Sequence, residues 1–251
     1  MRKFVILIAI ITAVMFLAGN ATAGYIIKSK ADSESTTPMG KQSETSISIS
    51  YIENDKIKNF DESKNTAIIM RMDKKIVYNI DYNKKTYQEI TIDELKKKTE
   101  SVMDMESPEM KERMKGMPPE QQAMMQNMMK EMISSIKVEK TGKTKDILGY
   151  KCSQYIVKKS GSKMVEMWST EDLEYNNAFS DYMSLTMPGG QAMMDEFKKM
   201  KGLPLETNMS MQMMGVENKS LTTATEIKKT DVKDSEFEIP EGFKKEAFIL
   251  Q

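Results

Sequence analysis

Apolar and polar residues alternate along much of the first third of the chain. The stretch TSISISY places Ile47, Ile49 and Tyr51 on one side of an extended chain and serines on the other. The stretches IIMRM and KIVYNIDY repeat this period of two. Such alternation with β-branched and aromatic residues is typical of half-buried antiparallel strands. We therefore expect a meander of short strands, with hairpin turns at the polar breaks Asp73-Lys74 and 83–85.

The stretch 30–46, between the first two expected strands, is rich in serine, threonine and lysine. We expect it to form a loose turn. Beyond the meander the pattern changes at Thr91, where Thr-Ile-Asp-Glu fits a capping box. In that motif the Thr91 hydroxyl accepts a hydrogen bond from the backbone N–H of Glu94, and the Glu94 carboxylate accepts one from the N–H of Thr91.

A methionine-rich helical insertion is expected at about residues 92–134. Its first helix is DELKKKTESVMDM, and Pro108, Pro118 and Pro119 divide the remainder into short helical pieces. Pro119 suits the first position of the last piece. A second helical insertion is expected at about residues 171–201, with QAMMDEFKKM as its clearest helix.

Strand patterns return between and after these insertions. The stretch YKCSQYIVKK has Cys152 and Ile156 on one face and Tyr155 and Val157 on the other. Apolar residues on both faces predict a covered strand, so the thiol of Cys152 should be buried. KMVEMWST is its expected partner, and LETNMSMQMM, SLTTATEIKK and an extended FEIPEGFKKE close the chain.

A long antiparallel sheet with two helical insertions predicts one α+β domain over residues 24–251. We expect the sheet to curve and the helices to pack on its concave face.

Residues 1–23 have the layout of a secretory signal peptide. A basic start precedes an apolar run, and Ala21-Thr22-Ala23 forms a small-x-small site before Gly24. The run is about 15 residues, short of the roughly 20 that span a bilayer, which disfavours the alternative of an uncleaved anchor. We expect an exported protein, periplasmic or extracellular, with no integral membrane segment after cleavage.

Composition excludes several classes of function. The chain has no histidine, which removes histidine-based catalysis and the usual zinc or iron sites. Its 37 basic and 37 acidic residues leave no excess of positive charge for nucleic acid. The acidic pairs Asp93-Glu94, Glu171-Asp172 and Asp195-Glu196 are interpreted as helix starts or solvated faces. We expect neither an enzyme nor a cofactor.

Residues 146–173 resemble an exported bacterial family of domains of unknown function. The matching residues are Ile147, Gly149, Tyr150, Tyr155, Val157, Glu166, Trp168, Thr170, Asp172 and Leu173. The family is similar in turn to the superfamily of the periplasmic lipoprotein carriers LolA and LolB. This resemblance implies a half-open antiparallel barrel with a helical lid over an apolar cavity. It implies a lipid or a lipidated protein as partner.

The methionines are the main candidates for a binding site. Ten lie between Met103 and Met132, and they form stripes at helical spacing. Methionine is unbranched and adapts to varied shapes, so a lid lined with it would suit an apolar ligand. The candidate ligand-binding residues are Met110, Met114, Met117, Met124, Met125, Met128, Met129, Met132 and Trp168.

Two other interpretations of the methionines stay open. A stripe at helical spacing also forms an ordinary buried face, in a structural or assembly factor without a small ligand. Thioether sulfur also selects Cu(I), which would make the chain a copper-binding protein. The candidate metal ligands are then Met103, Met105, Met209, Met211 and Met213. Trp168, the only tryptophan, fits either the core or a cavity wall.

Overall fold

The computed structural model describes residues 24–38, 40–103, 115–123, 136–173, 195–196, 198–213 and 216–248. Within these ranges twelve strands form one sheet, in the order β12-β6-β5-β4-β3-β2-β1-β11-β10-β9-β8-β7. The strands are β1 (Tyr25–Thr37), β2 (Gly40–Glu53), β3 (Lys56–Asp61), β4 (Thr66–Arg71), β5 (Ile76–Asp81), β6 (Thr86–Thr91), β7 (Ile136–Ile147), β8 (Tyr150–Lys159), β9 (Ser162–Thr170), β10 (Leu203–Met213), β11 (Val216–Lys229) and β12 (Lys244–Glu246).

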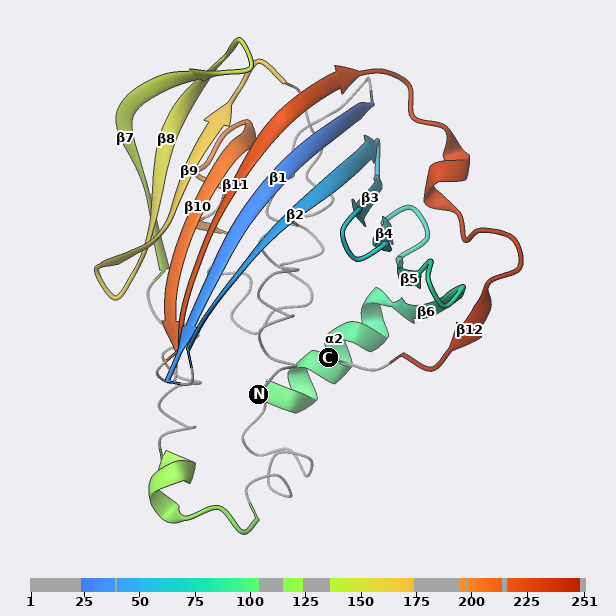
Figure 1. Cartoon of the computed structure of the whole chain (residues 1–251), viewed down its shortest axis with the longest axis horizontal. Coiled ribbons are helices and arrows are strands. Elements are labelled where there is room, and N and C mark those ends of the chain that lie inside the picture. Colours follow the sequence, from blue (N-terminus) through green and yellow to red (C-terminus); the bar gives the residue numbers. More distant parts are fainter. Residues whose placement is uncertain are drawn as a thin grey trace.

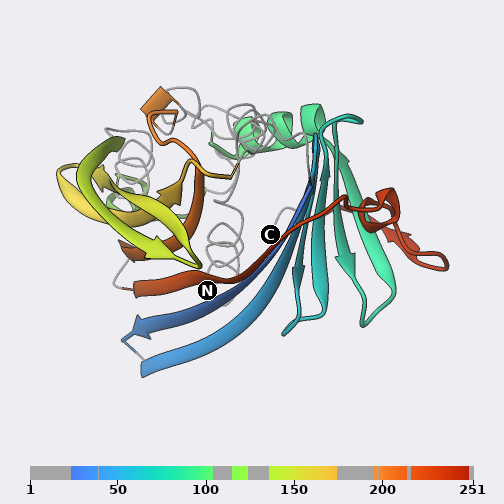
Figure 2. The same ribbon diagram turned by 90° about the horizontal axis from the view of Figure 1, so that it is seen from above.

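Two meanders make up this sheet. Strands β1 to β6 form one and β7 to β11 the other, and they join where β1 pairs antiparallel with β11. The short β12 adds to the edge of β6 in parallel, so the sheet is mixed. Figures 1 and 2 show the sheet curling around an open concave side, on which α2 (Ile92–Met103) lies. The expectation of one large curved sheet is thus confirmed.

The expected helical insertions are described only in part. Helix α2 begins at Ile92, as the capping box predicts. The N–H of Glu94 donates to Thr91 Oγ1 at 3.2 Å, and the N–H of Thr91 donates to Glu94 Oε2 at 3.1 Å. Residues 119–123 form a helical turn that starts at Pro119, also as predicted. The rest of both insertions lies mostly outside the described residues.

Aspartate side chains fix two hairpin turns of the first meander. Asp61 Oδ1 accepts hydrogen bonds from the backbone N–H groups of Ser63 and Lys64. Asp81 Oδ1 accepts hydrogen bonds from the backbone N–H groups of Asn83 and Lys84. These bonds fix the turn between β5 and β6, which was predicted over 83–85. The turn at Asp73-Lys74 also forms, since the N–H of Lys74 donates to the carbonyl of Arg71 at 3.0 Å.

The prediction of a loose turn at 30–46 is wrong. Strands β1 and β2 remain paired through this stretch, from Tyr25 opposite Ile52 to Thr37 opposite Gly40. Threonine favours strands, and β1 also pairs with β11 over most of its length. A strand that is paired on both sides needs no apolar face to stay extended.

The C-terminal segment, residues 230–243, crosses the outer side of β3 to β6, and we call it the strap (Figure 2). Its η1 turn (Asp234–Phe237) buries Phe237 in one cluster with Ile69 and Ile80. Arg71 holds the strap through Glu238 and donates two hydrogen bonds to Asp73, at 2.9 and 2.7 Å. Hydrogen bonds to these two carboxylates raise the pKa of Arg71. The bond to Asp73 contributes more than the bond to Glu238.

Cys152 is fully buried, as predicted. Burial raises the pKa of its thiol to about 11, so the reactive thiolate is scarce at neutral pH. Across the described ranges, no helix is both long and apolar enough to span a membrane.

Candidate ligand-binding face of the sheet

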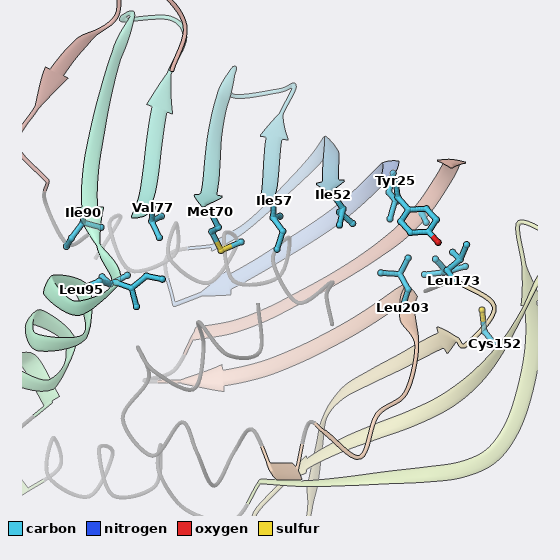
Figure 3. Packing of buried hydrophobic residues seen from close by; sticks show 14 residues of the cluster. Tyr25, Ile52, Ile57, Met70, Val77, Ile90, Leu95, Cys152, Leu173 and Leu203 are labelled. Atoms are coloured by element: carbon cyan, nitrogen blue, oxygen red, sulfur yellow. The ribbon is translucent and has the colours of Figure 1, made fainter. Parts of the chain in front are cut away.

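The concave side of the sheet, where α2 packs, is the candidate site, and we call it the inner side. Figure 3 shows buried side chains of the first meander that gather there with Leu95 of α2. On each strand these residues alternate with others that point to the outer side. The labelled members from the first meander are Tyr25, Ile52, Ile57, Met70, Val77 and Ile90.

A second apolar group lines the inner side of the other meander. Strand pairing carries the inner side across the junction: Ala31 of β1 lies opposite Thr222, Thr222 opposite Thr207, and Thr207 opposite Met167. The group around Met167 therefore lies on the same side of the sheet as Ile27. Its buried members are Val138, Tyr155, Val157, Val165, Met167 and Met209.

Small polar residues interrupt the apolar lining in the central strands, although the first cluster also reaches Leu203, Leu205 and Cys152 in the second meander. Ser50 on β2 donates to Asn59 Oδ1 at 2.5 Å, and both residues are buried. The alternation in TSISISY therefore forms strand β2 as expected, but it is a serine of this stretch that is buried on the inner side. Ile47 and Ile49 are only half-buried and point outward with Tyr51. The central strands β9, β10 and β11 continue the polar zone with Ser169, Thr207, Ser220 and Thr222.

Methionines contribute to the inner side from both meanders. Met209 and Met211 share one face of β10, and Met209 is 2% exposed. Met70 and Met72 on the first meander and Met167 on the second also pack there. Sequence reasoning did not single out these last three, although the alternation in IIMRM and KMVEMWST could have indicated them.

Few of the other candidate methionines lie among the residues that the structure describes. Met117 is half-buried, and its carbonyl accepts a hydrogen bond from the Gln122 side chain at 2.9 Å. Met103 ends α2, and Met213 lies opposite Val216 at the end of β10. The remaining candidates lie outside the described residues: Met105, Met110, Met114, Met124, Met125, Met128, Met129 and Met132.

Trp168 lies on the face of β9 opposite to Met167, with Gln154 and Glu206 as its neighbours in the adjacent strands, and it packs against the core cluster that includes Cys152 and Leu203. Its indole N–H donates to Glu166 Oε1 at 3.2 Å, and Lys145 Nζ lies 4.5 Å from its ring centroid. It is therefore not brought together with Met209 and Met167. The polar network around Trp168 left no signal in the sequence, because it depends on strand register.

Glu166 is the acceptor at the centre of that network. Its carboxylate accepts from Lys163 at 2.8 Å and from Gln154 at 2.7 Å, as well as from the indole. The Lys163 ammonium, followed by the Gln154 amide, holds the pKa of Glu166 below its ordinary value of 4.5, against the opposing effect of burial. A carboxylate of lowered pKa stabilises the fold above pH 4.5, and this contribution is lost as pH falls through its folded-state pKa.

We predict that fluorescence of the sole tryptophan stays constant from neutral pH down to about 4.5 and changes below it, as Glu166 becomes protonated. An acid titration of emission intensity measures this. Glu166→Gln should remove the step, because a carboxamide does not titrate. The same step in Glu166→Gln would instead assign it to unfolding of the whole domain.

Residues of the three acidic pairs make local hydrogen bonds and ion pairs, and Glu94 does so at a helix start, as expected. Glu94 caps α2, and Glu196 accepts from the backbone N–H of Val138 at 3.0 Å and pairs with Lys199. The N–H of Asp172 donates to Thr170 Oγ1 at 3.2 Å. In the part of the chain that the structure describes, histidine, cysteine and carboxylate side chains form no group of three that could hold a metal ion.

A protein family described as a domain of unknown function (DUF4412) matches residues 117–243, just over half of the chain. This confirms the prediction of such a family from residues 146–173, which lie inside the match. The comparison with curated proteins found no match.

Solved structures resemble the chain at low identity. They include an uncharacterized conserved protein from Thermus thermophilus (7% identity, TM-score 0.43, 88% of this chain and 91% of that chain). PNGF-II aligns at 13% identity and a TM-score of 0.38, over 88% of this chain and 32% of that one. A putative outer membrane lipoprotein-sorting protein domain from Vibrio parahaemolyticus aligns at 8% identity and a TM-score of 0.31, over 87% of this chain and 91% of that one.

Proposed function

Because the chain belongs to the DUF4412 family, whose description assigns no activity, we propose its function from the inner side of the sheet. The protein is an exported, non-enzymatic binding protein. It holds an apolar ligand, a lipid or the acyl chain of a lipidated partner, between the two apolar groups of a half-barrel. The lipidated partner follows from the resemblance of residues 146–173 to the family related to the lipoprotein carriers.

The observation that carries this proposal is the position of the inner methionines. Met70, Met72, Met167, Met209 and Met211 come from both arms of the curved sheet and point to its concave side. Unbranched thioether side chains repack around ligands of different shape at small cost. In this proposal the methionines of residues 103–132 form the lid over that side.

Native mass spectrometry tests the proposal on residues 24–251, purified from a bacterial periplasm without detergent or added metal. We expect a bound species of lipid size. Replacing Met124, Met128 and Met129 together by Asp should abolish its retention while circular dichroism shows an intact sheet. As a matched control, Gln121→Asp with Ala123→Asp adds charge to exposed positions of the helical turn and should leave retention unchanged.

Three outcomes contradict the proposal. If the protein still retains the bound species after the triple substitution, these methionines do not form a lid. A bare protein mass favours a structural or assembly role. A copper-sized increment that is lost in Met209→Ile, Met211→Ile and Met213→Ile would assign the methionines to Cu(I).

A further inference from the structure

Four buried hydroxyl groups lie together on the inner side, and we call them the hydroxyl row: Ser169, Thr207, Ser220 and Thr222. Their exposed fractions are 1%, 0%, 8% and 2%. Within the described structure none of the four hydroxyl oxygens has a hydrogen-bond partner. By contrast, the hydroxyl of Ser50 on the same side bonds to Asn59.

Strand register assembles the row from three neighbouring strands. Thr207 of β10 lies opposite Thr222 of β11, and Met209 lies opposite Ser220. Side chains at such opposed positions approach to about 5 Å between Cβ atoms. Ser169 lies two residues beyond Met167, which faces Thr207 from β9.

Apolar side chains flank the row along its own strands. Met209 follows Thr207 on the same face of β10, and Leu205 precedes it at the register shift between Pro204 and Glu206; all three are buried. On β9, Ser169 follows Met167 and Val165 in the same alternation. A molecule lying across these strands would therefore meet apolar groups on either side of a short polar zone.

Buried hydroxyls without partners are uncommon, because each loses its hydrogen bonds to water. Valine has nearly the shape of threonine, favours strands, and would suit an apolar face better. Hydroxyls at these positions are useful if a hydrogen-bonding group is bound there.

The row is uncharged. Charged neighbours on β10 and β11 point to the outer side, where Glu206 pairs with Lys145 at 2.7 Å and Lys219 with Glu217 at 2.9 Å. A phosphate or carboxylate would call for a cationic side chain beside it, and the described part of the row offers none. A neutral carbonyl group is satisfied by hydroxyl donors alone.

We infer that the hydroxyl row binds the ester or amide group of a neutral lipid, whose hydrocarbon chain lies along the flanking methionine and leucine side chains. This inference rests on the proposed function and names the ligand class of that site. Ser169, Thr207, Ser220 and Thr222 select lipids with an uncharged carbonyl linkage over plain hydrocarbon.

The experiment compares two probes on residues 24–251. Diphenylhexatriene, a hydrocarbon, reports occupation of the apolar site by its fluorescence, and a long-chain monoacylglycerol competes with it through its ester. In Thr207→Val with Thr222→Val, diphenylhexatriene should bind as before. Competition by monoacylglycerol should weaken about tenfold, for the two hydrogen bonds lost. Thr223→Val, which changes the neighbouring outward residue, is the matched control and should change neither probe.

Each outcome has a defined meaning. Diphenylhexatriene that fails to bind the unchanged protein overturns the proposed function and this inference with it. Normal diphenylhexatriene binding with unchanged competition in the double variant overturns the inference alone. Urea unfolding without ligand checks the double variant, which should be at least as stable as the parent. If it does not fold, Ser169→Ala with Ser220→Ala replaces it, with the same two outcomes.

Discussion

Replacing Gly202 with alanine should destabilise the protein by about 2–5 kcal/mol, because two costs add. Gly202 has a φ of +82°, and an alanine in this left-handed region costs about 1–2 kcal/mol. A Cβ there would also lie 1.9 Å from the carbonyl oxygen of Thr170, a backbone atom at the end of β9 that cannot swing away. Overpacking of this kind costs about 1–3 kcal/mol more. Urea unfolding followed by circular dichroism measures the loss.

Gly149 provides the matched control. Its φ of +81° is almost the same, but a Cβ on Gly149 would meet no atom within 4 Å. Gly149→Ala should therefore lose only the about 1–2 kcal/mol of the backbone conformation. Equal losses in the two variants would show that the chain relaxes around residue 202 and that the contact with Thr170 is unimportant.

Phe237→Ala should remove about 3–5 kcal/mol from the free energy of unfolding, because the substitution leaves a large cavity. Phe237 is 0% exposed and anchors η1 against the outer side of the sheet. Lys56 Nζ lies 5.5 Å from its ring centroid and adds a cation–π contact. Amide hydrogen exchange should also show faster exchange across the strap than in β1 or β11.

Phe243 tests whether burial causes this loss. It belongs to the same strap but is only half-buried, with its ring 5.5 Å from that of Tyr82. Phe243→Ala should therefore cost clearly less than Phe237→Ala. If the two variants unfold at the same urea concentration, the strap is held by its backbone and ion pairs.

Features coded by neighbouring residues were predictable. The capping box at Thr91 and Glu94, the turns at 73–74 and 83–85, and the burial of Cys152 all follow from residues close in sequence. The helical start at Pro119 does so too. Each depends on a local backbone preference that distant contacts did not override.

Features decided by distant pairing were not predictable. Alternation indicates that Ile47 and Ser48 lie on opposite faces of β2, but not which face turns inward. That choice depends on the pairing and curvature of the whole sheet, in which Ser50 lies opposite Ile27 of β1. The position of Trp168 on the face opposite to Met167 and the assembly of the hydroxyl row follow from the register of β9, β10 and β11 in the same way. No short window of sequence contains both partners of such a contact.

The pairing of β1 with β11 also has a consequence for how the chain folds. Tyr25, the first residue of β1, lies opposite Lys229, the last residue of β11. During synthesis β1 emerges before β2 to β10, and its partner β11 follows only after all of them. Closing so large a loop is entropically costly, and proteins dominated by such distant contacts fold slowly. The centre of the sheet therefore cannot form until β11 has emerged. Until then one edge of β1 has no partner, and a holding chaperone could shield that edge from aggregation.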